Sequence, residues 1–381
     1  MGGVRMEWKE DVLGNVLEVK YGKDHKKLAD GQYPVYGSGG LMRYVDSKLY
    51  DGPSILIPRK GTLNNIMFVE SPFWTVDTMF WSIINTDKVD PKFLFYSICK
   101  RDFASMNVGS AVPSMTVNIL NDIQISYPKN IEDQRRIASI LSSLDRKIEL
   151  NNKINADLEE MAQAIFKNWF VDFEPFKDGK FVDSELGMIP EGWKVGRLTE
   201  IASYMNGLAM QKFPPENNED SLPVLKIKEL GQGFCGTDSD RCSCNIKDEC
   251  KIHNGDVIFS WSGTLLVDVW CGGDCGLNQH LFKVTSKDYP KWFYYYWTKH
   301  HLQEFIHIAK DKAVTMGHIK RGHLEEAMVA IPDNDSMEKA HELFEPILSK
   351  LISLRLESSR LSTLRDTLLP RLMSGELEVP E

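Results

Sequence analysis

Six of the seven cysteines lie within one short stretch, and closely spaced thiolates are common ligands of structural zinc. A zinc ribbon needs paired Cys-x2-Cys motifs, whereas these cysteines give Cys-x-Cys, Cys-x3-Cys and irregular gaps. We therefore favour reduced thiols in loops or small apolar cores and assign no metal ligand, with a zinc-containing protein-interaction scaffold as the alternative. The six are Cys235, Cys242, Cys244, Cys250, Cys271 and Cys275; Cys99 lies apart from them.

Other residues that could be catalytic lack the neighbouring groups that catalysis requires. Asp145-Arg146-Lys147 has the acidic-x-Lys ending of metal-dependent nucleases, but it falls within a helical pattern, so we interpret it as a charged, solvated helix face. Phosphate-binding loops, His-Glu-x-x-His and Gly-x-Ser-x-Gly are all missing from the sequence. We therefore expect no catalytic residue in this chain, and a free-standing DNA-modifying enzyme remains only an alternative.

Polar loop residues instead have the types that read DNA. Arg and Lys suit guanine and phosphate, Asn and Gln suit adenine, and backbone amides suit phosphate. Arg59-Lys60 and Ser260 to Ser262 both precede a Gly-Thr pair, while Ser110 and Lys312 both precede Ala-Val. We predict DNA binding by the following residues: Arg43, Arg59, Lys60, Asn64, Asn65, Lys100, Arg101, Ser110, Lys226, Lys228, Ser262, Gln279, Lys310, Lys312, His318, Lys320 and Arg321.

An internal repeat must position these loops. Three pairs of residues share one offset of 202 positions, namely Gly61 with Gly263, Phe80 with Phe282, and Ala111 with Ala313. Each copy contains short strand-like runs punctuated by Gly, Pro and Asn. One helix-like stretch lies in each copy, Pro91 to Phe103 and Pro290 to Ile308. The repeat therefore predicts two mixed α/β domains of one architecture.

A long run with apolar residues at alternating three- and four-residue spacing follows each copy, which is typical of a coiled-coil seam. Each helix would be on the order of 45–50 Å long. We expect the two helices to pack together and hold the domains apart, with polar Asn151 and Asn155 in the first seam and Ser358 and Arg365 in the second. Two ordinary helices, each packed on its own domain, are the alternative.

The residues that we assign to spacer helices or partner binding are Gln134, Ile137, Leu141, Leu144, Ile148, Leu158, Ile165, Trp169, Phe170, Phe344, Leu351, Leu354, Leu361, Leu368 and Leu372.

The 381 residues have ordinary globular composition, with 42% hydrophobic residues and a formal net charge of -9. Such an acidic balance argues at first against nucleic acid, but it is unevenly distributed. Residues 1–130 carry 15 basic and 14 acidic residues and residues 191–332 carry 16 and 18, so the two helical regions hold most of the net negative charge. Near-neutral recognition domains would bind phosphates weakly without partners. We expect a cytoplasmic location, because the sequence has no apolar run of membrane-spanning length and no signal peptide.

Six phrases of the sequence belong together: Tyr33 to Gly40, Gly52 to Gly61, Phe73 to Thr78, Glu132 to Asn151, Ala164 to Phe173 and Leu364 to Leu377. Together they resemble the specificity (S) subunit of type I restriction–modification systems, and the resemblance covers essentially the whole chain. The second helical run departs from the pattern, because it opens Asp333-Asn-Asp-Ser-Met-Glu338 without the Glu-x-Gln of the first, and we expect Pro346 to interrupt its early turns.

The resemblance implies an α+β fold with two similar target-recognition domains, separated by two long antiparallel coiled-coil helices in an internal pseudo-twofold repeat. It also implies that each domain reads one half of a bipartite double-stranded DNA site, and that the chain is non-catalytic. Expected partners are two methyltransferase subunits and a restriction or motor subunit, with S-adenosylmethionine, ATP and Mg on those partners and no cofactor here. The expected divisions are residues 1–130 and 184–332 for recognition, and residues 131–183 and 333–381 for the spacer helices.

Overall fold

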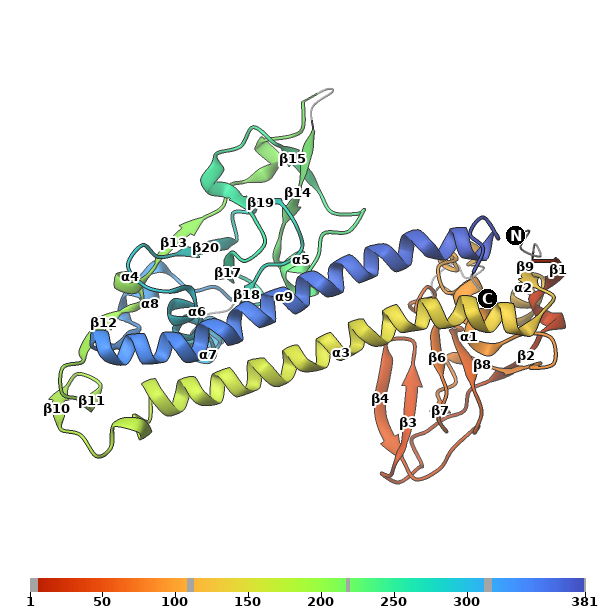
Figure 1. The fold of residues 1–381 in the computed structure, drawn as a ribbon, viewed down its shortest axis with the longest axis horizontal. Coiled ribbons are helices and arrows are strands. Elements are labelled where there is room, and N and C mark those ends of the chain that lie inside the picture. The colour runs from red at the N-terminus through yellow and green to blue at the C-terminus, as the bar shows by residue number, and fades with distance from the viewer. Residues whose placement is uncertain (1–5, 108–112, 217–219, 312–316, 380–381) are drawn as a thin grey trace, which may run out of the picture. The chain divides into compact units, whose positions relative to one another are not determined.

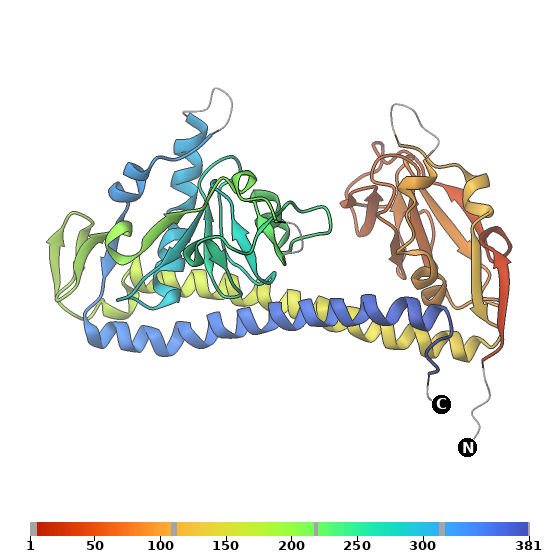
Figure 2. The same ribbon diagram turned by 90° about the horizontal axis from the view of Figure 1, so that it is seen from above.

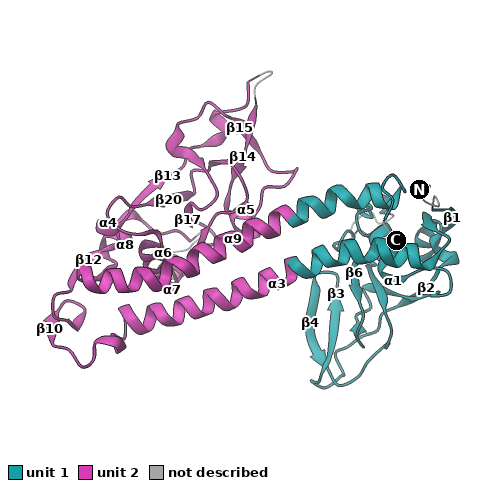
Figure 3. Ribbon diagram, in the orientation of Figure 1, with its two compact units in different colours: residues 1–147, 361–381 teal, residues 148–360 magenta. Residues whose placement is uncertain are grey.

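The computed structural model describes residues 6–107, 113–216, 220–311 and 317–379. Two mixed α/β regions and two long helices make up the chain (Figure 1, Figure 2). The chain divides into two compact units, unit 1 with residues 1–147 and 361–381, and unit 2 with residues 148–360 (Figure 3). The helices α3 (Ile131–Phe170) and α9 (Asn334–Met373) each contribute a segment to both units. Within the described ranges, no helix is long and apolar enough to cross a membrane.

The described residues of unit 1 form three small sheets and two short α-helices. The strands and helices are β1 (Trp8–Val12), β2 (Leu17–Tyr21), β3 (Tyr33–Gly37), β4 (Gly40–Val45), β5 (Ser54–Pro58), β6 (Met67–Val69), β7 (Trp74–Thr75), β8 (Met79–Ile84), β9 (Gln124–Pro128), α1 (Pro91–Ile98) and α2 (Val117–Asn121). One sheet has the antiparallel order β2-β8-β5-β6, a second has the order β4-β3-β7 with β3 and β7 parallel, and β1 pairs with β9. The fully buried β5 is an interior strand of the first sheet.

Unit 2 repeats this topology and adds a hairpin. Its elements are β10 (Phe181–Ser184), β11 (Gly187–Pro190), β12 (Lys194–Arg197), β13 (Ser203–Asn206), β14 (Ser221–Leu225), β15 (Arg241–Ser243), β16 (Lys251–Ile252), β17 (Val257–Ser260), β18 (Leu266–Val269), β19 (Cys275–Leu277), β20 (Leu281–Thr285), β21 (Met328–Ile331), α4 (Leu198–Ile201), α5 (Ile227–Gln232), α6 (Lys291–His300), α7 (Leu302–Asp311) and α8 (Arg321–Glu326). The orders β13-β20-β17-β18 and β15-β14-β19-β16 match the sheets of unit 1 strand for strand, with β16 added, and β12 pairs with β21 as β1 does with β9.

The register of the strands confirms the repeat that the sequence predicts. Ile57 pairs with Phe80 in unit 1, and Phe259 pairs with Phe282 in unit 2. Ile57 and Phe259 are 202 residues apart, and so are Phe80 and Phe282, so the paired residues keep the offset found in the sequence. The prediction of two mixed α/β domains of one architecture is confirmed, while the third sequence pair, Ala111 with Ala313, lies outside the described residues.

The predicted extent of the domain helices was wrong. Helix α1 ends at Ile98, five residues before the predicted end at Phe103, because the chain turns to bury the Phe103 ring completely. The second predicted helix is two helices, α6 and α7, that meet at His301. All side chains from Trp292 to Thr298 are buried, and the turn after them lets α7 bury Phe305 in the same core.

The segments of α3 and α9 in unit 2 pack against each other through aromatic rings. Phe166 of α3 and Phe344 of α9 have ring centroids 6.1 Å apart, and Phe344 stacks on Trp292 of α6 at 4.7 Å. Farther along α3, Asn151 donates a hydrogen bond to Glu357 of α9 at 2.8 Å. Residue numbers fall along one helix as they rise along the other, so the two segments are antiparallel.

The predicted seam is confirmed in its apolar and in its polar members. In unit 2, Phe344, Leu351 and Leu354 are buried, and the polar Asn151 and Asn155 are buried beside them at 0% and 8% exposure. In unit 1, the seam residues Ile137, Leu141 and Leu372 lie in one buried cluster with domain residues such as Phe93 and Tyr127. The remaining predicted seam residues are Leu144, Ile148, Leu158, Ile165, Trp169, Leu361 and Leu368, which are half-buried, and Phe170, which is buried.

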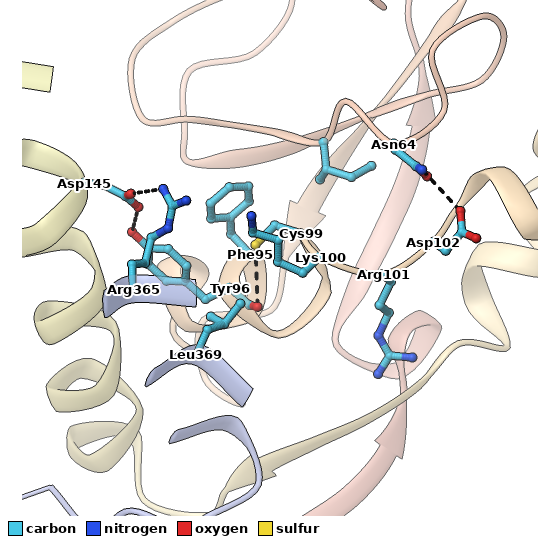
Figure 4. A pocket seen from close by; sticks show the side chains of 11 residues that line it. Asn64, Phe95, Tyr96, Cys99, Lys100, Arg101, Asp102, Asp145, Arg365 and Leu369 are labelled. Carbon is cyan, nitrogen blue, oxygen red and sulfur yellow. Dashed lines mark hydrogen bonds and ion pairs between the residues drawn. The ribbon is translucent and has the colours of Figure 1, made fainter. Parts of the chain in front are cut away.

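An ion pair joins the two long helices within unit 1, where the sequence led us to expect a solvated charge. Asp145 of α3 accepts a hydrogen bond from Arg365 of α9 at 2.7 Å and another from the Tyr96 hydroxyl of α1 at 2.5 Å (Figure 4). Burial, and then the bond to Asp145, raise the pKa of Tyr96 far above its usual value, so the phenol stays protonated. The interpretation of Asp145 as a solvated face was wrong, because Arg365 and Tyr96 compensate its charge inside the seam.

Both long helices exceed the predicted length. Each has 40 residues, which corresponds to about 60 Å rather than 45–50 Å. Helix α9 continues through Pro346, although a proline inside a helix costs about 3 kcal/mol. The neighbouring Phe344, Ile347 and Leu348 are buried in the core of unit 2, and that burial keeps the helix unbroken. The expected interruption at Pro346 is therefore absent.

Gln134 fixes the start of α3 to the domain of unit 1. Its side chain is fully buried, and its amide oxygen accepts a hydrogen bond from the Asp90 amide at 2.7 Å. Its amide nitrogen donates to the carbonyl oxygens of Pro128 at 2.7 Å and Lys88 at 3.2 Å. This side chain thus stabilises its own unit and offers no surface to a partner.

Replacing Gln134 by Ala is expected to lower the free energy of unfolding by roughly 3 kcal/mol. The substitution removes three hydrogen bonds, one of them buried and two part-buried, at roughly 1–3 kcal/mol each before relaxation. The matched control is Arg135→Ala, whose side chain is exposed and should change stability by less than about 0.5 kcal/mol. Urea unfolding followed by circular dichroism measures both, and equal stability of the two variants would contradict this role of Gln134.

Replacing Asn155 by Leu is expected to raise the free energy of unfolding by roughly 1–2 kcal/mol. Both polar atoms of the Asn155 amide are buried without a hydrogen-bond partner among the described residues, so an apolar side chain removes a desolvation cost. The control is Asn152→Leu, which is exposed on the same helix and should leave stability nearly unchanged. A less stable Asn155→Leu protein in the urea titration would show that the polar group stabilises the seam.

Candidate nucleic-acid interface

In unit 1, the loop after β5 is hydrogen-bonded to the segment that begins at Pro113. The Met115 amide donates to the Arg59 carbonyl at 2.9 Å, and the Gly61 amide donates to the Pro113 carbonyl at 3.3 Å. Gly61 has a φ of 87°, a left-handed conformation that favours glycine, and a β-bridge joins Lys60 to Ser114. These contacts hold the Arg59-Lys60 loop against residues 113–115.

Unit 2 builds the same loop pair from different side chains. The Ile319 amide donates to the Trp261 carbonyl at 3.1 Å, and the Gly263 amide donates to the Gly317 carbonyl at 2.9 Å. Gly263 has a φ of 66°, and a β-bridge joins Ser262 to His318. The same two hydrogen bonds, bridge and left-handed glycine therefore occur in both units, which means that the fold presents an equivalent pair of loops twice.

A third segment lies against the loop pair in unit 1. The Asn65 side-chain amide donates to the Ser38 carbonyl at 2.8 Å, and a Cβ on Gly61 would lie 3.0 Å from the Ser38 hydroxyl oxygen. The glycine-rich turn between β3 and β4 is thus anchored beside Lys60, whose side chain is exposed. Arg59 packs over the Tyr21 ring at 5.6 Å, which orients its guanidinium.

In unit 2, the aromatic residue Trp261 takes the place in the loop that Arg59 takes in unit 1. The Trp261 ring lies 5.9 Å from the His280 ring and 6.4 Å from the His318 ring. A small open cavity of about 280 Å³ is lined by Gly263, Thr264 and Lys310 among others. The exposed cations Lys310, Lys320 and Arg321 therefore belong to elements that meet at this loop pair.

The structure brings some of the predicted DNA-binding residues together at the loop pairs and separates others from them. Arg59, Lys60, Asn65, Lys310, His318, Lys320 and Arg321 belong to the loop pairs or line them, and Gln279 precedes the His280 that contacts Trp261. Ser262 has its backbone in the loop pair, but its side chain is only 9% exposed and offers little to a base. Ser110 and Lys312 lie outside the described residues.

The other predicted residues contact parts of the protein outside the loop pairs. The Asn64 side chain donates to Asp102 at 3.2 Å and accepts from the Ala104 amide at 2.8 Å. Lys100 pairs with Asp366 of α9 at 3.2 Å, so it lies at the long helix. The remaining residues form internal bonds as well: Arg43 with Leu28 and Asp30, Arg101 with Gln124, Lys226 with Asp240, and Lys228 with Asp238.

Sequence reasoning missed Ser38, Trp261 and His280 as members of these sites. None of them is an Arg, Lys, Asn or Gln, and Ser38 and His280 reach the loop pair through sheet topology rather than through sequence spacing. The glycine-rich turn lies within the phrase Tyr33 to Gly40, which we used only for the family resemblance. The signal that could have found Trp261 is its place directly before Ser262-Gly263-Thr264, where the first copy has Lys60-Gly61-Thr62.

The cysteine cluster forms parts of small apolar cores in unit 2. Cys242 and Cys250 are buried with Met210, Val224 and Ile246. Cys275 is buried in a neighbouring cluster, and the half-buried Cys235 packs against the same cluster. Among the residues that the structure describes, no three His, Cys, Asp or Glu side chains are grouped to hold a metal ion. The burial therefore supports the small-core interpretation of these thiols.

Comparison with known proteins assigns the chain to a family. A family described as "Type I restriction modification DNA specificity domain" matches residues 6–160 and 190–361. The chain is 29% identical to the type I restriction enzyme MjaIX specificity subunit of Methanocaldococcus jannaschii, over 93% of this chain and 86% of that protein. It is 22% identical to the HindI specificity subunit of Haemophilus influenzae, over 82% and 83% of the two chains.

A solved structure shares the fold. The crystal structure of the type I restriction–modification system S subunit from M. genitalium superposes with a TM-score of 0.59 at 15% sequence identity, and the match covers 100% of this chain and 98% of that one. Together with the repeated topology and the two family matches, these findings lead to one conclusion. The chain belongs to the family of type I restriction–modification DNA specificity proteins, as a specificity subunit with two target-recognition domains.

Proposed function

We propose that this specificity subunit recognises a bipartite double-stranded DNA site, with one half-site read by each target-recognition domain. The observation that supports this most strongly is the equivalent loop pair in the two units, built on Gly61 in one and Gly263 in the other. Two loops with equivalent backbones and different side chains suit the recognition of two different base sequences in the same way. Lys60 and Arg59 supply one set of donors, and His318, Lys320 and Arg321 supply the other.

The chain also acts, in this proposal, as a scaffold for two methyltransferase subunits and the restriction subunit. The acidic charge of the helical regions and the near-neutral balance of the domains fit a subunit that grips DNA firmly only within a complex. S-adenosylmethionine, ATP and Mg belong to those partners. We propose residues 1–130 and 184–332 as the recognition domains and residues 131–183 and 333–381 as the spacer regions.

An exchange of one domain tests the split site directly. Residues 8–128, from the first residue of β1 to the last of β9, are replaced by the matching segment of a related specificity subunit with another target. Mapping of methylated adenines in host DNA should then show one half-site changed, with the other half-site and the spacer retained. A change in both halves, or methylation without a defined split site, would contradict the proposal.

Charge reversal at the loop pairs is expected to weaken DNA binding by the assembled complex. Lys60→Glu and Lys320→Glu should each lower affinity at least tenfold and reduce the slope of log affinity against log salt by about 1, because each removes about one phosphate contact. The matched controls are Lys88→Glu and Lys287→Glu, exposed lysines in the loops before α1 and α6. Fluorescence anisotropy at several salt concentrations measures the slopes, and equal effects in variants and controls would reject these loops as the DNA-binding surface.

A further inference from the structure

Two neighbouring apolar side chains of unit 1, Leu41 and Met42, are exposed at the start of β4; we call them the apolar pair. Leu41 is 52% exposed and Met42 is 57% exposed. Strand β4 lies at the edge of the sheet β4-β3-β7 and forms a hairpin with β3 (Figure 1). Adjacent large apolar side chains in water indicate a surface that another molecule covers.

A β-bulge explains why both side chains are exposed. Side chains of a regular strand alternate between its two faces, so one of two neighbours normally points toward the protein. In the hairpin, Tyr36 pairs with Leu41 and Val35 pairs with Arg43, which leaves Met42 as the extra residue of β4. The extra residue interrupts the alternation and allows Leu41 and Met42 to face solvent together.

The apolar pair adjoins the loop pair that surrounds Gly61. The turn before β4 carries Ser38, whose carbonyl accepts a hydrogen bond from the Asn65 side chain at 2.8 Å. A Cβ on Gly61 would lie 3.0 Å from the Ser38 hydroxyl oxygen, and only two residues separate Ser38 from Leu41. The apolar pair therefore extends the candidate DNA-binding surface of unit 1 and is not a separate patch.

The corresponding segment of unit 2 is polar. Strand β15 takes the place of β4 in its sheet, and the residues that lead into it are Asp238, Ser239 and Asp240. Both aspartates form ion pairs with lysines of the preceding segment, Lys226 and Lys228. The same place in the repeat therefore offers an apolar surface in one unit and compensated charges in the other, which suits the recognition of two different base sequences.

The chemistry of the apolar pair selects one group of the DNA. Neither side chain carries a charge or a strong hydrogen-bond donor, so neither can hold a phosphate or read a polar base edge. In the major groove, thymine presents an apolar C5-methyl group that the other three bases lack. Contact with that methyl group buries apolar surface on both sides and discriminates thymine from unmodified cytosine.

We infer that Leu41 and Met42 determine specificity by contacting the C5-methyl group of a thymine in the half-site that unit 1 reads. The inference rests on the proposed function, because it assigns one base contact within the split site. Lys60 on the adjoining loop supplies a donor for phosphate or a polar base edge, and the apolar pair supplies the apolar contact.

Uracil substitution tests this contact without changing base pairing. The complex of the full chain with the host system's methyltransferase subunits is bound to duplexes in which one thymine at a time is replaced by deoxyuridine, which lacks only the C5-methyl group. The domain exchange described above identifies the half-site of unit 1, and both of its strands are scanned. At one thymine or more, affinity should fall about three- to fivefold, the effect of one buried methyl group. Uracil in the spacer is the control and should leave affinity unchanged.

A double variant, Leu41→Ser with Met42→Ser, should bind the unaltered duplex more weakly and no longer distinguish thymine from uracil at that position. The matched control is Leu186→Ser with Met188→Ser, which alters two exposed apolar side chains of the β10–β11 hairpin in unit 2 and should retain the full uracil effect. Circular dichroism checks that both variants are folded, which their exposed positions favour.

Several results would overturn the inference. They are a double variant that keeps the uracil effect, an unaltered complex that is indifferent to uracil throughout this half-site, and a half-site without thymine in either strand. Indifference to uracil is also the result expected of an apolar wedge in the minor groove, where thymine presents no methyl group. Loss of methyltransferase subunits from the double variant in native mass spectrometry would assign the apolar pair to a protein contact instead. The proposed function survives all of these results, since it fails only if the unaltered complex binds no defined split site.

Discussion

The burial of one apolar stripe on each of two long helices is the constraint on which the rest of this structure depends. A soluble helix of 40 residues with such a stripe needs a partner along its whole length. In unit 2 the partner surfaces are Phe166 and Phe344, and in unit 1 they are Leu141 and Leu372 with the domain core. Each domain is thereby attached to a pair of helices rather than to one, and the ends of its short helices are fixed against them.

The backbone is alike in the two copies of the repeat, whereas the side chains that attach each long helix to its domain differ. In unit 1, Gln134 ties the start of α3 to the domain through three hydrogen bonds. The equivalent position in α9 is Met337, which packs against the apolar core of unit 2. There Trp292 stacks on Phe344 and donates to His341 at 3.1 Å. The two joints therefore satisfy the same backbone geometry by polar bonding in one unit and by aromatic packing in the other.

The sequence alone was enough to predict the elements whose signal is periodic or repeated. The spacing of residues such as Ile137, Leu141 and Leu351 predicted the seam, and the offset of 202 residues predicted two domains of one topology. Other predictions were wrong because contacts made in the fold outweighed the local sequence signal. Burial of Phe344 and Ile347 keeps α9 continuous at Pro346. The ion pair with Arg365 places Asp145 in the seam rather than on a solvated face.

The candidate interface was predictable only in part, for a related reason. Charged residue types marked Lys60 and Lys320, but a residue's type does not reveal the partner it meets in the fold. Asn64 and Lys100 were assigned to DNA on type alone, and in the structure they contact Asp102 and Asp366. Whether an exposed side chain remains available depends on long-range contacts that spacing along the chain does not encode.

We propose that the paired helices set the distance between the two half-sites, and lengthening both helices tests this proposal most directly. Tandem duplication of residues 149–155 in α3 and residues 355–361 in α9 adds one heptad to each at opposing levels and preserves the seam. Seven residues add about 10 Å, which corresponds to about three base pairs of duplex DNA. Mapping of methylated adenines should show the same two half-sites with a spacer about three base pairs longer. Methylation retained at the original spacing would contradict the account.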